Sequence, residues 1–105
     1  MGYQWNAFRK LLDIFAENDI HVIFVQVPEY LEGRRTAKMH PNNTKIEKIA
    51  EDYEITFLNY NDELAGEINK DPSNYSDWGH MNTKGSVIFS KRLAEDLKAY
   101  FENIE

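Results

Sequence analysis

Hydrophobic residues along the chain follow two different spacings, and each spacing predicts a different kind of element. Near the N-terminus they recur every three or four positions, which predicts an amphipathic helix over roughly residues 4–17. Its apolar stripe is Trp5, Phe8, Leu11, Leu12 and Phe15. Residues 20–27 are instead β-branched and almost continuously apolar, which predicts a strand covered on both faces, as in a parallel sheet. Pro28 ends this strand, because proline cannot donate to a ladder.

Both spacings return later in the chain. The segment Thr44-Lys45-Ile46-Glu47 matches a capping box, so a second helix is expected to begin there. Its buried stripe is Ile46, Ile49, Ala50 and Tyr53. Residues 55–58 predict a second short strand, and a last helix is expected from about Thr83 to Asn103, capped by Asn82 or Thr83. The apolar stripe of that helix is Phe89, Leu93, Leu97, Tyr100 and Ile104.

Two long polar stretches separate these elements. Residues 29–43 and 61–81 are expected to be loops, the second with a short helical turn near Glu63–Ile68. The order helix, strand, helix, strand, helix predicts one α/β domain over residues 1–105, with parallel strands and flanking helices. In open α/β sheets the ligand site lies beyond the carboxyl ends of the strands. Both polar stretches follow those ends, so residues 59–81 are expected near Pro28-Glu29-Tyr30 on the side where chemistry takes place.

Two strands alone are a small sheet. They leave open edges, and they give the helices little to pack against. We therefore expect the sheet to be completed either by a second copy of the chain, as in a homodimer, or by an N-terminal portion of a larger domain. A three-layer, flavodoxin-like architecture is the fold expected for the completed sheet.

Composition narrows the classes of partner. The net charge is −6 and the sequence pI is about 5.0, which argues against nucleic acid and anionic membranes as partners. The N-terminal residues lack the basic and apolar regions of a signal peptide, and no apolar run approaches the roughly 18 residues of a membrane helix, so membrane insertion is not expected. The chain has no cysteine, which leaves the compartment open.

The residues best suited to chemistry are Asp77 and His80, which lie just ahead of the last helix. Imidazole titrates near neutral pH, and a carboxylate that accepts from one ring nitrogen leaves the other free to take a proton. A separation of three residues in a turn allows that contact. The structural alternative is a helix N-terminus, with Asp77 in a turn, His80 on the surface and Asn82 as the cap.

The pattern Asp77-x-x-His80-x-Asn82-x-x-Gly85, continued by Phe89, Leu93-Ala94 and Leu97, resembles the last conserved block of the SGNH (GDSL-like) hydrolase superfamily. It is especially similar to the acyltransferase-like branch of that superfamily. The order of the preceding elements also fits, so the chain resembles the C-terminal portion of such a domain. The resemblance implies that His80 is the catalytic base and that Asp77 orients it, in an enzyme whose serine attacks an acyl ester of a small molecule or a carbohydrate.

The chain departs from that family at the nucleophile. The family's Gly-Asp-Ser-like block and its oxyanion-hole Gly and Asn blocks lie upstream, and none of them precedes Ile20 here. The serines present are Ser73, Ser76, Ser86 and Ser90. The first two are expected in turns and the last two within a helix, whereas unrelated hydrolases expose a serine nucleophile on a strand-to-helix elbow. The chain alone is therefore expected to be a poor esterase or none.

Other interpretations stay open. The chain can be a non-catalytic α/β interaction or oligomerisation module that keeps the fold without the chemistry. His40 could join Asp77 and His80 in a metal site of two histidines and a carboxylate, although no spacing requires it. His21 is expected to be partly buried and bonded to a backbone group. The cations Arg34, Arg35 and Lys38 could hold an anionic substrate group or be solvated. No cofactor and no metal are expected.

Overall fold

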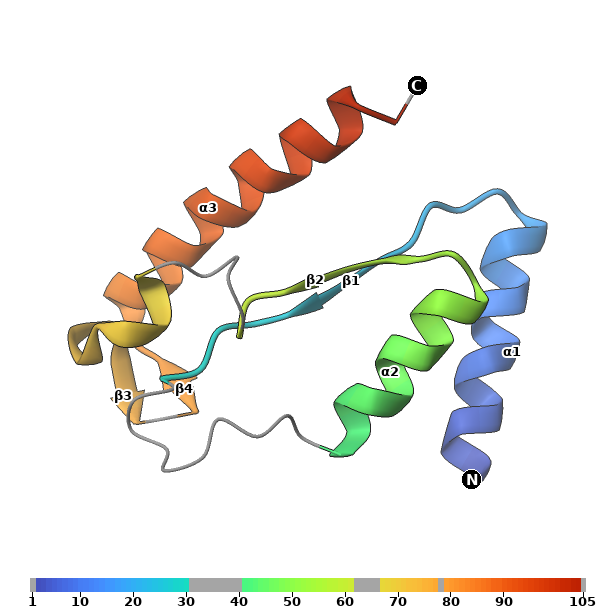
Figure 1. Cartoon of the computed structure of the whole chain (residues 1–105), viewed down its shortest axis with the longest axis horizontal. Coiled ribbons are helices and arrows are strands. Elements are labelled where there is room, and N and C mark those ends of the chain that lie inside the picture. The colour runs from blue at the N-terminus through green and yellow to red at the C-terminus, as the bar shows by residue number, and fades with distance from the viewer. Residues whose placement is uncertain (1, 31–40, 62–66, 78, 105) are drawn as a thin grey trace. The chain divides into compact units, whose positions relative to one another are not determined.

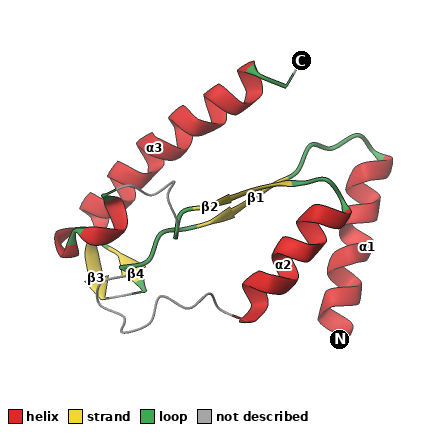
Figure 2. Ribbon diagram, in the orientation of Figure 1, coloured by secondary structure: helices red, strands yellow, loops and turns green. Residues whose placement is uncertain are grey.

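The computed structural model describes residues 2–30, 41–61, 67–77 and 79–104, and only the backbone at 41–43. The described part is mixed α/β (Figures 1 and 2). In chain order its elements are α1 (Tyr3–Glu17), β1 (Ile23–Gln26), α2 (Pro41–Asp52), β2 (Thr56–Asn59), the 3₁₀ turns η3 (Ile68–Lys70) and η4 (Pro72–Asn74), β3 (Tyr75–Asp77), β4 (His80–Met81) and α3 (Thr83–Glu102). The chain divides into two compact units, which we describe separately.

The first unit contains residues 2–25 and 41–58, with α1, α2 and most of β1 and β2. The two strands are parallel neighbours, as the strand–helix–strand order predicts. The apolar stripes of both helices supply the core, in which Leu12, Ile49 and Ala50 are buried. Phe24 on β1 joins this core, because its ring lies 5.7 Å from that of Phe8 on α1 and 6.4 Å from that of Phe57 on β2.

Both helices of this unit end in the same way. At the end of α1, the N–H of Ile20 donates to Phe15 O at 2.9 Å and the N–H of Asp19 donates to Ala16 O at 3.2 Å. Asp19 has φ 56°, and together these features form a Schellman motif. Ile55 and Glu54 repeat the two hydrogen bonds at the end of α2, where Glu54 also has φ 56°. Each motif reverses the chain into the strand that follows.

These helix ends explain why β1 is shorter than predicted. Ile20 belongs to the helix-terminating motif, and β1 begins only at Ile23. The prediction that this strand is covered on both faces is wrong for the chain as described, because Val25 is 38% exposed. Leu11 was expected in the apolar stripe of α1, but it is 44% exposed.

The second unit contains residues 26–30 and the described part of 59–104, with η3, η4, β3, β4 and α3. Tyr60 is fully buried at its centre. Its ring meets that of Phe89 on α3 edge-on at 4.9 Å, and its hydroxyl donates to Asp96 Oδ2 at 2.6 Å. Its backbone N–H donates to Gln26 O, and its carbonyl accepts from the side chain of Asn69. Tyr60 therefore joins three segments of the unit.

Two predictions about element boundaries need correction, and a third falls mostly outside the described residues. The second helix begins at Pro41, so the supposed capping box lies inside it; proline suits a first helical position because its missing N–H is not needed there. The stretch 61–81 is not one loop, because its described part holds η3, η4 and both short strands. The turn expected near Glu63–Ile68 falls mostly outside the described residues, and η3 begins at Ile68.

Candidate functional site

Asp77 and His80 lie on a small antiparallel hairpin that leads directly into α3. In this hairpin Tyr75 of β3 pairs with Met81 of β4, and Asp77 pairs with His80. Ser76 is the extra residue between the two pairs, so β3 carries a bulge there. The prediction placed these residues in a loop, and the structure replaces that loop with a hairpin that holds the two side chains directly opposite each other.

The contact that the spacing of the two residues predicts is present. His80 Nδ1 lies 2.8 Å from Asp77 Oδ1, which also accepts the N–H of Gly79 at 2.9 Å. The imidazole hydrogen bond, followed by the amide hydrogen bond, holds the pKa of Asp77 below its usual value. A carboxylate at Nδ1 favours the tautomer that carries its proton there, which leaves Nε2 as the acceptor. The side chain of His80 is 79% exposed, so a reacting group can reach it.

Asn82 and Gly85, the next two positions of the motif, have structural roles. Asn82 is the N-cap of α3, and its Oδ1 accepts the N–H of Gly85 at 2.9 Å. Its Nδ2 donates to Ser73 O at 2.8 Å, and its backbone N–H donates to Asn74 O at 2.9 Å. A Cβ on Gly85 would stand 2.1 Å from that same Asn74 oxygen, so only glycine fits. The motif therefore attaches the hairpin to the first turn of α3.

Ser73 is held by charged neighbours on both sides. Its hydroxyl donates to Asp71 Oδ1 at 2.8 Å and accepts from Lys84 Nζ, which is also 3.7 Å from Asp71 Oδ2. Its backbone N–H donates to Asp71 as well, and these bonds from Ser73 hold the pKa of the carboxyl of Asp71 below its usual value. This is the geometry of a capped turn joined to α3, which agrees with the interpretation of Ser73 as a turn residue.

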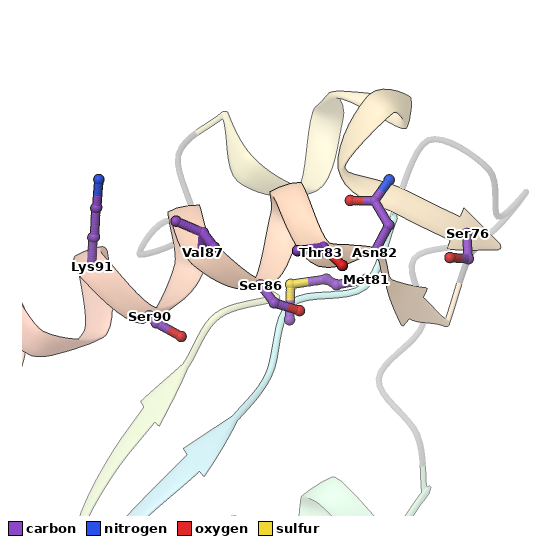
Figure 3. Close-up of a pocket in the computed structure, with 8 residues that line it drawn as sticks. All are labelled: Ser76, Met81, Asn82, Thr83, Ser86, Val87, Ser90 and Lys91. Carbon is purple, nitrogen blue, oxygen red and sulfur yellow. The ribbon is translucent and has the colours of Figure 1, made fainter.

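The other serines line an open pocket of about 680 Å³ on the second unit. Its walls include Ser76 and Met81 from the hairpin, and Ser86, Val87 and Ser90 from α3 (Figure 3). Figure 3 shows Ser86 and Ser90 projecting from one side of α3, while Lys91 extends to the other. All serines of the chain lie in described residues, and each is on a 3₁₀ turn, a strand or a helix rather than a strand-to-helix elbow.

Residues that follow β1 contact residues of the second polar stretch, as the sequence predicts. The ring of Tyr30, just beyond β1, lies 5.7 Å from that of Tyr75 on β3. Asn61, just beyond β2, accepts the N–H of Glu29 at 2.7 Å. Burial, followed by the charge of Glu29, raises the pKa of Tyr75 to about 12, so its phenol stays protonated. Sequence reasoning placed Tyr30 near this stretch but missed the role of Asn61 and the burial of Tyr75, because both depend on contacts distant in sequence.

Several predicted candidates lie elsewhere or outside the described residues. His21 precedes β1 and is exposed, so the prediction of a partly buried strand histidine is wrong. The candidate metal ligand His40 and the cations Arg34, Arg35 and Lys38 fall outside the described residues. Within the described part, no three His, Asp or Glu residues are grouped as metal ligands. None of the described helices is long and apolar enough to span a bilayer.

Comparison with known proteins adds no relative to this picture. No family model, curated protein or solved structure matches the chain.

Proposed function

We propose that Asp77 and His80 are the orienting acid and the general base of an SGNH-type ester hydrolase or O-acyltransferase. The observation that carries the proposal is the 2.8 Å contact between His80 Nδ1 and Asp77 Oδ1, which leaves Nε2 of an exposed imidazole as the proton acceptor. The ring contact between Tyr30 and Tyr75 supports it, because it brings the hairpin to residues beyond a parallel strand. In the completed domain we propose a three-layer, flavodoxin-like sheet.

The chemistry proposed is acyl transfer through a serine. The serine hydroxyl attacks the ester carbonyl while Nε2 of His80 takes its proton, and Asp77 stabilises the imidazolium that forms. The imidazolium then returns the proton to the leaving alcohol as the carbon–oxygen bond breaks. Water, in a hydrolase, or a sugar hydroxyl, in an acyltransferase, attacks the acyl-serine with His80 again as base. The substrate class is therefore an acyl ester of a small molecule or an acetylated carbohydrate.

The attacking serine and the oxyanion hole are proposed to come from outside the described part of this chain. Ser73 is bonded to Asp71 and Lys84, and Ser86 and Ser90 lie within α3. Asn82 caps α3, and Gly85 leaves room for the backbone oxygen of Asn74. We therefore propose that other groups donate to the oxyanion. The chain alone should therefore lack esterase activity, because a triad without its nucleophile loses most of its rate.

A fluorophosphonate probe followed by intact mass measurement tests this proposal. The 105-residue chain should gain no adduct. The coding sequence upstream of Met1 should supply a Gly-Asp-Ser-like block after a hydrophobic strand, and a protein that includes it should be labelled at that serine. In this longer protein His80→Ala should slow labelling by about 10²-fold or more, while His21→Ala, at an exposed histidine outside the hairpin, should not. An adduct on Ser73 or Ser76 of the short chain contradicts the assignment, as does labelling that His80→Ala leaves unchanged.

A further inference from the structure

Asn82 bonds to three different residues at the base of the hairpin. Its backbone N–H donates to Asn74 O, its side-chain Nδ2 donates to Ser73 O, and its Oδ1 accepts from Gly85 N, at 2.9, 2.8 and 2.9 Å respectively. Ser73 and Asn74 immediately precede β3, and Asn82 immediately follows β4. Asn82 therefore joins the two ends of the hairpin to each other and to the first turn of α3, beside the contacts that Lys84 makes with Ser73 and Asp71.

The hairpin depends on attachment at its base, because its own ladder is short. Its ladder consists of two residue pairs separated by a bulge, and isolated hairpins of this size are marginal in water. Burial does not fix the functional side chains either, since that of Asp77 is 58% exposed and that of His80 is 79% exposed. Tyr75, at the base of β3, is the buried residue of the ladder, whereas Asp77 and His80 lie at the far end.

We propose that Asn82 is a positioning residue for His80, and that the two polar atoms of its side chain, Oδ1 and Nδ2, have different roles. Oδ1 caps α3, while Nδ2 fixes the two ends of the hairpin to each other so that Asp77 stays opposite His80. The inference rests on the proposed function of His80 as a base, and adds the residue that keeps the base in its working tautomer. It also separates two roles of one amide, because capping needs an acceptor and positioning needs a donor.

Asn82→Ser and Asn82→Asp separate these roles. Serine and aspartate are both good N-caps, so Gly85 N keeps an acceptor in either variant. The ionised aspartate has no proton to donate to Ser73 O, and the serine hydroxyl that caps the helix is one atom shorter than the amide. The readout is the ratio of the Nδ1–H to the Nε2–H tautomer of His80, from ring ¹⁵N shifts of the full chain at about two pH units above the usual histidine pKa. Both variants should lower this ratio at least about threefold, toward the value in Asp77→Asn, where the charged acceptor is lost.

Tyr60→Phe is the matched control. It removes the 2.6 Å hydrogen bond to Asp96 from the same unit without touching residues 73–85, so it weakens the fold but should leave the tautomer ratio unchanged. A tautomer ratio that stays at the wild-type value in both Asn82 variants overturns the proposal, because the turn around Gly79 would then be enough to hold Asp77 opposite His80. A ratio that Tyr60→Phe lowers equally also overturns it. The measurement does not depend on turnover, so its failure is distinguishable from failure of the proposed function.

Discussion

Gly85→Ala should destabilise the second unit, because α3 begins against the backbone of Asn74. The added Cβ would stand 2.1 Å from Asn74 O and 3.0 Å from Asn74 C, and real Cβ contacts do not fall below 3.0 Å. The carbonyl and the helix would have to separate by about 0.9 Å. Asn74 is 3% exposed, so its backbone has no solvent to move into without disturbing its neighbours.

The expected cost follows from the contacts that must change. Overpacking of this kind costs roughly 1–3 kcal/mol. The Asn74 oxygen that is displaced also accepts the N–H of Asn82, and loss of that hydrogen bond adds about 1 kcal/mol. The higher helix propensity of alanine offsets up to about 1 kcal/mol of this destabilisation. We therefore expect the free energy of unfolding of this unit to fall by about 2 kcal/mol.

Native-state amide exchange of α3 is the suitable assay. The chain consists of two compact units, so a global unfolding curve can mix two transitions, whereas the amides of α3 report the second unit alone. A loss of about 2 kcal/mol makes the most protected of these amides exchange about 30-fold faster. Gly79→Ala is the matched control, since the nearest atom to a Cβ there is Asp77 Oδ1 at 3.8 Å, an ordinary contact.

Either of two exchange results would refute this prediction for Gly85→Ala. If Gly85→Ala exchanges no faster than Gly79→Ala, the close approach of α3 to Asn74 does not limit this position. If it exchanges more slowly than the wild type, helix propensity alone decides the outcome.

Two further predictions concern acid stability and association. The lowered pKa of Asp77 means that its contact with His80 stabilises the fold above the usual carboxyl pKa and loses that effect as pH falls through the lowered value. Asp77→Asn should therefore flatten the acid side of a plot against pH of the opening free energy of the α3 amides, measured by hydrogen exchange, and parallel curves for the two proteins would contradict this. Val25 on β1 is 38% exposed, so we expect self-association that Val25→Lys weakens; a stable monomer at micromolar concentration in sedimentation would count against it.

The sequence predicted the three helices, β1 and β2, because hydrophobic spacing records which face of each element is buried, whereas it predicted a loop where η3, η4, β3 and β4 lie. The parallel pairing of β1 and β2 also followed from the strand–helix–strand order. The form of the helix ends was harder. The end of the first helix near residue 17 was predicted, but both Schellman motifs place an acidic residue, Asp19 or Glu54, at the left-handed position where glycine is the usual signal.

The candidate site divides in the same way. The contact between Asp77 and His80 was predictable, because three residues in a turn bring two side chains together. The attachment of the hairpin was not, since it depends on the carbonyls of Ser73 and Asn74, and backbone acceptors carry no residue signature. Asn82 was predicted as one of two caps for α3, but the second use of its amide needed coordinates.

Asp77 and His80 make different kinds of contact from Asn82 and Gly85, and this difference bears on whether the motif is functional. In the described part of the chain, the side chains of Asp77 and His80 bond to each other and to the backbone of the turn, and both are exposed. An exposed pair of this kind adds only a small, pH-dependent increment of stability, and it is not needed to start α3. Asn82 and Gly85 make the contacts that hold the start of α3, through the helix cap and the close approach to Asn74. A motif that served only to start a helix would need the second pair and not the first, and this asymmetry favours chemistry at His80 over a purely structural role for the hairpin.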